Sequence, residues 1–202
     1  MKRTLLWIGG ILWLSGIGVG MGLLWDYALT PGMPARPPEK WPAGSRLPRV
    51  PGRPTLIMAA HPRCPCTRAS LGELSWIVAR SQGQLSAFVL FLKPSAAPEG
   101  WEKTDLWQSV AEMHEVGVWQ DVDGSEAARF HAHTSGQTVL YDKDGKLLFR
   151  GGITMARGHA GASVGRNAIL ELLAERSVTT ETPVYGCPLS EQASATAKDS
   201  TQ

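Results

Sequence analysis

The most informative segment of the chain reads Thr55-Leu-Ile-Met-Ala-Ala60-His-Pro-Arg-Cys64-Pro-Cys66-Thr-Arg68. Residues 55–59 form an apolar run of the length expected for a buried strand. A turn containing proline and cysteine follows, and apolar residues then recur at the spacing of a helix packed by one face: Leu71, Leu74, Ile77 and Val78. The segment therefore predicts a strand, a tight turn that carries two cysteines, and a helix.

The remaining chain, to about residue 174, continues to alternate between strand and helix patterns. Near its end the sequence Asp142-Lys143-Asp144-Gly145 is typical of a hairpin turn between two strands. This alternation predicts an α/β domain, with a mostly parallel central sheet, a terminal hairpin and helices on both faces. The elements expected after the first helix are strands at 86–92, 116–119, 137–141 and 146–149, and helices at 104–113, 125–130 and 164–174.

The two cysteines lie between the first expected strand and the first expected helix. Pro65 suits the first helical position, which places Cys64 near the cap and Cys66 in the opening turn. Unpaired backbone N–H groups and the helix dipole favour a thiolate there. Arg63 and Arg68 add positive charge nearby, and His61 does so when it is protonated. We therefore expect a lowered cysteine pKa and a nucleophile suited to disulfide exchange.

The Cys64–Cys66 pair has other interpretations. A disulfide between them would close a very small ring, and the departure from relaxed geometry would make it easy to reduce. Two incidental cysteines are the structural alternative. A zinc site needs more ligands than the pair supplies, unless histidines join.

The amino-terminal part of the chain contains an uncharged run from Leu5 to Trp25, whose only polar side chain is Ser15. A helix of this length spans about 32 Å, enough to cross a hydrocarbon core of about 30 Å. A cleaved signal peptide is the alternative, but the run exceeds the usual apolar core, and Asp26-Tyr27-Ala28 is a poor cleavage site. We expect a single-pass, uncleaved anchor at residues 1–30 that crosses the membrane through residues 5–25.

The orientation of this anchor follows from charges at its two ends. Lys2 and Arg3 precede the apolar run and Asp26 follows it, which favours a cytoplasmic amino terminus. Arg36 and Lys40 beyond the far end argue the other way. We expect the bulk of the chain outside the cytoplasm.

Composition divides the rest of the 202 residues. Eight of the 14 prolines fall within residues 31–54, which predicts a semi-rigid, extended linker. Residues 55–176 form the expected domain, and residues 177–202 are expected to be a polar, flexible tail, with an exception around residues 185–189. The net charge of +2, from 20 basic and 18 acidic side chains, argues against nucleic-acid binding.

The strand, the Pro-Cys turn and the order of elements resemble the thioredoxin fold over residues 55–176. The anchor and linker are similar to those of membrane-tethered, periplasm-facing proteins of the TlpA/ResA kind. Residues 64–68, with Thr134-Ser-Gly-Gln137 and the segment 151–159, are most similar to RedB-type thioredoxin-like proteins, some of which carry selenocysteine. The resemblance implies a redox-active cysteine pair that needs no cofactor, on the periplasmic side of a bacterial-type inner membrane.

Two departures from thioredoxins stand out. Matching Pro65-Cys66 to the family's Pro-Cys places Arg63, not a cysteine, at the motif's first position. Gln137 replaces the family's cis-proline, which faces the cysteines, and its amide is a candidate donor to a thiolate or a peroxide. Thr67, within the turn, joins these residues as a supporting candidate.

Other side chains carry weaker signals. Cys187 could resolve a mixed disulfide with Cys64 or Cys66, or remain an idle tail thiol. His159, in a glycine-rich loop, is a candidate acid/base or metal ligand, with an exposed loop histidine as the alternative. His131 and His133 are expected to be solvated loop residues.

The leading function is a membrane-tethered thiol–disulfide oxidoreductase in which Cys64 and Cys66 exchange with a protein or small-molecule partner. One alternative is a Sco-like copper-binding or copper-delivery protein that uses Cys64, Cys66 and His159. A second is a thiol peroxidase, with one cysteine oxidised and then resolved by the other. A redox-inert binding module is the remaining alternative.

Overall fold

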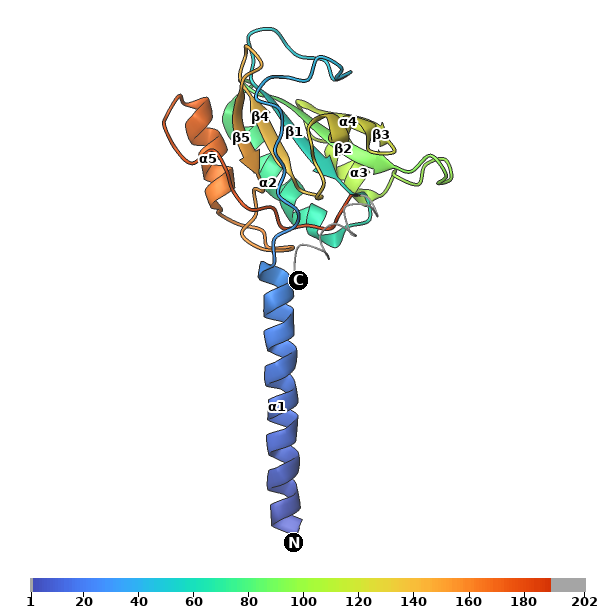
Figure 1. Ribbon diagram of the computed structural model, residues 1–202, viewed down its shortest axis with the longest axis vertical. Helices are drawn as coiled ribbons and strands as arrows, with labels where there is room; N and C mark the ends of the chain where they lie inside the picture. Colours follow the sequence, from blue (N-terminus) through green and yellow to red (C-terminus); the bar gives the residue numbers. More distant parts are fainter. Residues whose placement is uncertain (1, 190–202) are drawn as a thin grey trace.

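The computed structural model describes residues 2–189 (Figure 1). The helices are α1 (Lys2–Leu29), α2 (Pro65–Ser81), α3 (Asp105–Ala111), α4 (Ser125–Arg129) and α5 (Val164–Leu173). The strands are β1 (Thr55–Ala60), β2 (Ser86–Lys93), β3 (Val116–Val122), β4 (Thr138–Tyr141) and β5 (Leu147–Gly151). Their order along the chain is the one that the sequence periodicity predicts.

The strands form one sheet in the order β3-β2-β1-β4-β5. Strands β1, β2 and β3 are parallel, with Thr55 opposite Ser86 and Ala87 opposite Val116. Strand β4 is antiparallel to β1, and β5 is antiparallel to β4, so β4 and β5 form the expected hairpin. Strand β1 is the central strand of the sheet. The turn with the cysteines follows its carboxyl end and therefore lies at the middle of that end of the sheet.

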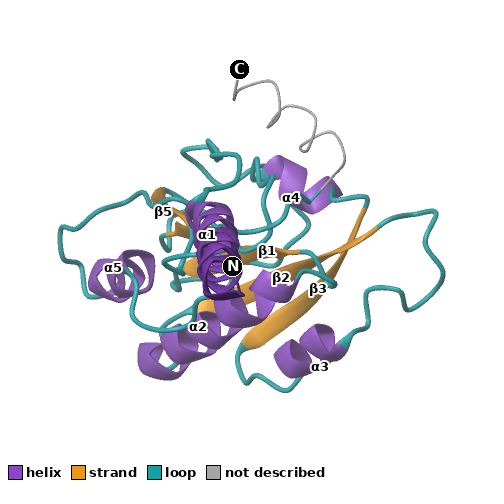
Figure 2. Cartoon of the chain, turned by 90° about the horizontal axis from the view of Figure 1, so that it is seen from below, coloured by secondary structure: helices purple, strands orange, loops and turns teal. Residues whose placement is uncertain are grey.

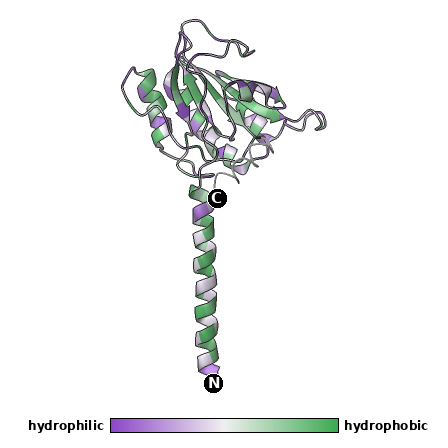
Figure 3. Ribbon diagram, in the orientation of Figure 1, coloured by the Kyte–Doolittle hydropathy of each residue, from purple (hydrophilic) through white to green (hydrophobic). Residues whose placement is uncertain are grey.

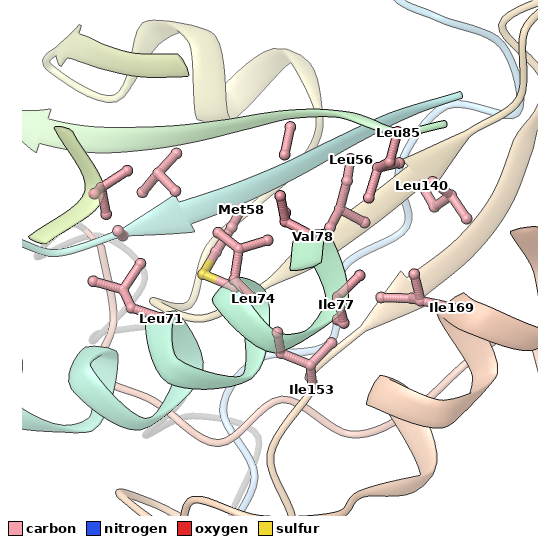
Figure 4. Close-up of a cluster of buried hydrophobic side chains, with 14 of the residues drawn as sticks. Leu56, Met58, Leu71, Leu74, Ile77, Val78, Leu85, Leu140, Ile153 and Ile169 are labelled. Atoms are coloured by element: carbon pink, nitrogen blue, oxygen red, sulfur yellow. The ribbon is translucent and has the colours of Figure 1, made fainter. Parts of the chain in front are cut away.

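Strand β1 is buried along its whole length because both faces of the sheet are covered. Leu56 and Met58 face a core with the apolar stripe of α2 and with Ile169 of α5 (Figure 4). Ile57 and Ala59 face the opposite core. This arrangement explains the continuous apolar run, since a strand buried on both faces has no solvated side.

Helices α2, α3 and α5 lie on one face of the sheet, and α4 lies on the other (Figure 2). The face with α4 is also covered by residues of the proline-rich segment 31–54, where the sequence predicted an extended linker. Trp41 packs edge-on against Phe130 and Tyr141, with ring centroids 5.2 and 5.4 Å apart, and Leu47 is buried. The single short helix α4 leaves apolar surface on this face, and the linker's own apolar side chains cover it.

The linker also makes main-chain hydrogen bonds to the hairpin. The N–H of Trp41 donates to Gly145 O at 2.7 Å, and the N–H of Leu147 donates to Glu39 O at 2.9 Å. The Tyr141 hydroxyl donates to Pro38 O at 2.9 Å. Prolines lack N–H donors, but their carbonyls remain good acceptors, so a proline-rich segment can still bind the edge of a sheet.

Residues 178–189 also differ from the expectation of a flexible tail. The N–H of Arg150 in β5 donates to Thr180 O at 2.9 Å, and the N–H of Thr182 donates to Arg150 O at 3.2 Å. Val184 and Leu189 are buried. The exception expected around residues 185–189 therefore extends along this whole segment, and it covers part of the free edge of β5. Residues 190–202 lie outside the described part of the chain.

Helix α1 extends away from the domain, and none of its residues is buried (Figure 1). Its surface is apolar along most of its length (Figure 3). It is the one helix within residues 2–189 that is long and apolar enough to cross a membrane.

Candidate functional site

Helix α2 begins at Pro65, with Cys64 at the N-cap and Cys66 in the first turn. Cys64 has an extended backbone, with φ −86° and ψ 119°, as an N-cap residue should. Its carbonyl accepts from the N–H of Thr67 at 3.1 Å. A cysteine therefore stands at the N-cap, where a serine, threonine, aspartate or asparagine is usual. When Pro65-Cys66 is matched to the Pro-Cys of thioredoxins, Arg63 falls at the first position of the motif. The N-cap residue of α2, however, is Cys64.

A third cysteine completes the site. The Sγ atoms of Cys64 and Cys187 lie 2.9 Å apart, within hydrogen-bonding distance for two sulfurs. The Sγ atoms of Cys64, Cys66 and Cys187 all lie within 4.8 Å of one another. We call these three sulfurs the cysteine cluster. Cys64 and Cys66 are buried, whereas Cys187 is half-buried, so Cys187 is the most exposed of the three.

Cys187 reaches the cluster because its segment pairs with the loop before β4. The N–H of Ser135 donates to Cys187 O at 2.8 Å, and the N–H of Leu189 donates to His133 O at 2.8 Å. Thr134 and Pro188 form an antiparallel bridge between these hydrogen bonds. We call residues 133–136 the site loop. The segment thus lies along the site loop as a short added strand.

The approach of the two backbones requires glycine at position 186. A Cβ atom there would overlap the carbonyl oxygen of Ser135. On its other side the Gly186 carbonyl accepts a hydrogen bond from the Arg157 guanidinium. The glycine and the arginine together fix the position of Cys187 beside Cys64.

These contacts stabilise a thiolate on Cys64. Hydrogen bonding from the Cys187 thiol is the main cause that lowers the pKa of Cys64 to about 4, against the opposing effect of burial. The backbone N–H groups of Cys187 and Cys66 lower this pKa further. A thiolate pointing at the N-terminus of a helix is the nucleophilic form of cysteine at neutral pH. The lowered pKa that the sequence predicted for a cysteine of this turn is therefore that of Cys64.

The other two thiols remain protonated beside this charge. Burial, followed by the negative charge of Cys64, raises the pKa of Cys66. The hydrogen bond to Cys64, followed by burial and the Cys64 charge, raises the pKa of Cys187. The Arg157 guanidinium acts in the opposite direction on both thiols. The cluster therefore holds one thiolate and two thiols, with Cys187 as the donor to Cys64.

His61 and Arg63 line the turn without contacting the sulfurs directly. The Nδ1 atom of His61 accepts from the N–H of Arg63 at 3.1 Å, and its ring lies edge-on to Trp101. The Arg63 guanidinium stacks on the Trp101 ring at 4.7 Å. Burial lowers the pKa of His61, so the charge expected on this histidine is disfavoured at neutral pH.

Thr67 connects the turn to the site loop. Its hydroxyl lies 2.8 Å from the Ser135 hydroxyl, and the Ser135 oxygen also accepts from the N–H of His61 at 2.9 Å. Arg68 instead points away from the turn and pairs with Asp105 at the start of α3, where both side chains are exposed. The positive charge near the cluster comes from Arg157, and not from Arg68.

Gln137 lies next to the site loop but makes no hydrogen bond to the cysteines in the described part of the chain. Its Oε1 accepts from the N–H of His133 at 3.3 Å, and its buried Nε2 has no partner there. The peptide bonds of residues 2–189 are all trans. Within these residues the Gln137 amide therefore does not make the contact to a thiolate that the sequence predicted, and the thiolate at Cys64 is instead stabilised by Cys187, Cys66 and Thr67.

Neither His159 nor His131 joins the cysteine cluster. His159 is exposed, and its N–H donates to Ala156 O at 3.2 Å. His131 is exposed, as the sequence predicted, and its Nδ1 lies 2.6 Å from Arg36 O of the linker. Within residues 2–189, the side chains that could share one metal ion are the three cysteines, without His159.

Sequence reasoning missed Ser135 and Arg157 as site residues, and it left Cys187 open. Each belongs to a segment far from Cys64 along the chain. Ser135 and Cys187 meet through main-chain pairing, and Arg157 reaches them through its guanidinium, which donates to Gly186 O. The glycine of Tyr185-Gly-Cys187 was the available signal, because glycine beside cysteine favours close approach of two backbones.

The central sheet, the antiparallel hairpin and the cysteine at the N-terminus of α2 define a thioredoxin-like fold. A hypothetical protein of Sinorhizobium meliloti shares this fold, with 21% identity, a TM-score of 0.58, and coverage of 80% of this chain and 94% of its own. An uncharacterized conserved protein of Geobacillus kaustophilus matches with 19% identity and a TM-score of 0.55, over 80% and 92% of the two chains. These identities establish similarity of fold alone.

A secreted disulfide oxidoreductase of Mycobacterium tuberculosis matches with 18% identity and a TM-score of 0.43, over 62% of this chain and 84% of its own. No protein-family model matches the chain, and no curated protein matches it. The closeness to RedB-type proteins stays a prediction.

Proposed function

We propose that the protein is a membrane-tethered thiol–disulfide oxidoreductase with Cys64 as its nucleophile. The observation that carries this proposal is the Cys64 sulfur at the N-cap of α2, with a pKa near 4 and two further thiols within 4.8 Å. A stabilised thiolate with neighbouring thiols is the arrangement that disulfide exchange requires.

The exchange has two steps. The Cys64 thiolate attacks one sulfur of a partner disulfide, forms a mixed disulfide, and releases the other partner sulfur as a thiolate. A second thiol of the cluster loses its proton, attacks the Cys64 sulfur, and releases the remaining partner thiolate. The partner disulfide is reduced by two electrons, and two protein thiols become one disulfide. The reverse sequence oxidises a partner dithiol, and neither direction needs a cofactor.

Arg157 and the helix terminus both help the reaction. The N-terminus of α2 stabilises the thiolate that Cys64 becomes whenever it leaves a disulfide. The Arg157 guanidinium lowers the pKa of the other two thiols and so favours their deprotonation. The partner is a protein or small-molecule disulfide or dithiol on the side of the membrane where the domain lies. We place the domain on the periplasmic side of a bacterial-type inner membrane.

The test is the reduction of insulin disulfides by the full-length chain in detergent, with dithiothreitol as the electron donor. We expect catalysis above the dithiothreitol background, its loss in Cys64→Ser, and unchanged activity in His159→Ala. An equal rate with and without the wild-type chain would overturn the proposal.

A second candidate function is binding of Cu(I), and the three-sulfur cluster favours it. Cys64, Cys66 and Cys187 would hold the ion, because soft thiolates suit Cu(I). The structure replaces the expected His159 with Cys187 in this ligand set. The full-length chain, reduced and purified without a chelator, would then carry one copper that His159→Ala retains and Cys187→Ala loses. Copper-free protein that still fails to bind added Cu(I) would contradict this candidate.

A further inference from the structure

We propose that Cys187 is the resolving cysteine, so that the disulfide closing each exchange joins Cys64 to Cys187 and leaves Cys66 as a free thiol. This inference rests on the proposed function. It differs from the pairing that the Cys64-Pro65-Cys66 sequence suggests, because it joins the start of α2 to a segment more than a hundred residues further along the chain.

The first reason is position. The Sγ atom of Cys187 lies 2.9 Å from that of Cys64, and the intervening space holds no other group. Main-chain hydrogen bonds on both sides of Cys187 hold it there: Ser135 N–H to Cys187 O at 2.8 Å and Leu189 N–H to His133 O at 2.8 Å. A thiol held by its backbone next to a reacting sulfur needs little further ordering before it attacks.

The second reason is what happens to the charges during the reaction. The hydrogen bond to the Cys64 thiolate is the largest cause that raises the pKa of Cys187. When Cys64 enters a mixed disulfide its negative charge disappears, and this cause disappears with it. The Arg157 guanidinium remains and favours the Cys187 thiolate. Loss of the Cys64 charge thus acts in the direction that a resolving thiol needs, against burial, which still raises the pKa of Cys187. The 2.9 Å separation of the two sulfurs remains the observation that carries the inference.

Cys66 shares this behaviour only in part, because the charge of Cys64 and the hydrogen bond to it come after burial among the causes that raise its pKa. Burial is the largest cause that raises the pKa of Cys66, and burial persists after Cys64 has reacted. Cys66 is also on the same rigid helical turn as Cys64, separated by Pro65 alone. A bond between two cysteines one residue apart closes a very small ring, for which the opening turn of α2 would have to deform. Cys187 can approach Cys64 without any change in α2.

The chemistry balances with a small disulfide as the co-substrate. The Cys64 thiolate attacks oxidised glutathione, and one glutathione leaves as a thiolate. Cys187 then gives its proton to water, attacks the Cys64 sulfur, and expels the second glutathione as a thiolate. Oxidised glutathione gains two electrons, and Cys64 and Cys187 together lose two electrons when they form the disulfide.

The experiment maps the linkage directly. The reduced full-length chain in detergent is treated with oxidised glutathione, quenched with N-ethylmaleimide, and digested with trypsin without reduction. Trypsin cleaves after Arg63 and Arg68, so Cys64 and Cys66 share peptide 64–68, while Cys187 lies on peptide 177–198. We expect these two peptides to be joined, with one maleimide on peptide 64–68.

Two matched variants assign the roles. Cys66→Ser should still lose two hydrogens and give the same joined peptides. Cys187→Ser should stop with glutathione attached to Cys64. An internal disulfide within peptide 64–68 of the wild type, or glutathione accumulating on Cys66→Ser, would overturn the inference and leave the proposed function intact. A Cys64 that never reacts with oxidised glutathione, in any of the three chains, would overturn both.

Discussion

At the scale of single residues, the site depends on a cysteine at the N-cap of α2. The side chain of Cys64 faces the backbone N–H of Cys66 and the thiol and N–H of Cys187. All three groups stabilise a negative charge, and they outweigh burial, which opposes it. The chemistry of the site therefore follows from the position of one residue at the start of α2.

This charge predicts an unusual pH profile for alkylation. Because the pKa of Cys64 is lowered to about 4, its thiolate is present above that pH and is lost below it. Iodoacetamide should label Cys64 at a nearly constant rate above about pH 5, whereas the rate of an ordinary cysteine rises until about pH 8.5. Brief labelling followed by mass analysis of peptide 64–68 measures the profile.

The matched variant for this measurement is Cys187→Ala. It removes the largest cause of the shift, so the midpoint of the Cys64 profile should move upward by at least one pH unit, about 1.4 kcal/mol. Identical profiles for the variant and the wild type would show that Cys187 does not hold the Cys64 thiolate.

A second prediction concerns the variant Gly186→Ala, which leaves all three cysteines unchanged. In Gly186→Ala the added Cβ would overlap the carbonyl oxygen of Ser135, so the segment with Cys187 must move away from the site loop. The midpoint for labelling Cys64 should rise as it does in Cys187→Ala. A Gly186→Ala chain with the wild-type profile would mean that the close approach of the two backbones is not needed.

The sequence alone identified Cys64 and Cys66 because a strand-to-helix turn is a local pattern. It left the role of Cys187 open, since the pairing with residues 133–135 joins segments that no local pattern connects. It also predicted a hydrogen bond from the Gln137 amide to a cysteine thiolate, which the structure does not contain within residues 2–189. Counting positions before a strand cannot give the direction of a side chain. Arg157 was visible only as part of a motif, and its effect on the thiols depends on the fold.

At the scale of elements, the packing of α5 on α2 depends on a buried ion pair. Glu73 of α2 and Arg166 of α5 are 2.8 Å apart, with side chains 6% and 13% exposed. Glu73 also accepts from the N–H of Gly161 at 2.6 Å, and the Arg166 guanidinium stacks on Trp76 at 3.8 Å. The pair thus joins α2, α5 and the loop between β5 and α5.

Removing one partner of this pair should destabilise the domain strongly. In Arg166→Met the Glu73 carboxylate is left buried without its partner, which costs about 3 kcal/mol of the free energy of unfolding. Urea denaturation followed by tryptophan fluorescence measures the loss. The control is Arg176→Met, which breaks the exposed pair with Glu171 and should cost less than about 0.5 kcal/mol. Equal losses in the two variants would contradict a structural role for the buried pair.

The linker gives another prediction at this scale. Because Trp41 packs on Phe130 and Tyr141, Trp41→Ala should loosen residues 31–54 from the sheet and cost about 2 kcal/mol. Limited trypsin digestion should then cut after Lys40, Arg46 and Arg49 faster than in the wild type. Val50→Ala is the control, because Val50 is exposed. A wild-type chain cut at these sites as rapidly as the variant would favour the extended linker that the sequence predicted.

The order of strands and helices was predictable because each element has its own hydrophobic period. The packing of residues 31–54 and 178–189 was not, since prolines interrupt both segments and neither has a helical or strand period of hydrophobic residues. Such composition excludes regular structure but does not exclude packing, as the buried side chains of Leu47 and Val184 show. The free edge of β5 and the bare face beside α4 supply the surfaces that these segments cover.

At the scale of the whole molecule, the cysteine cluster lies at the end of the domain from which α1 leaves. The N–H of Arg157 donates to Ala28 O at 3.0 Å, its Nε donates to Tyr27 O at 3.1 Å, and the same guanidinium contacts Gly186 O. One arginine thus links the end of α1 to the segment that holds Cys187. If α1 spans a membrane, the site faces the membrane surface, which suits a partner at that surface.

Membrane attachment itself is testable by fractionation. The apolar surface of α1 predicts that the chain remains in the membrane pellet after washing with alkaline carbonate and enters solution only with detergent. A chain that begins at residue 31 should be released without detergent. Release of the full-length chain by carbonate would contradict a membrane-spanning anchor.

The reduction potential of the full-length chain tests the central claim, a reactive thiolate at Cys64, most directly. Equilibration in glutathione buffers of graded ratio, followed by mass analysis of the trapped protein, measures it. A stabilised Cys64 thiolate favours the reduced form, so we predict one two-electron transition at a potential less negative than about −270 mV. A chain that shows no transition, or one more negative than about −300 mV as structural disulfides do, would contradict the account.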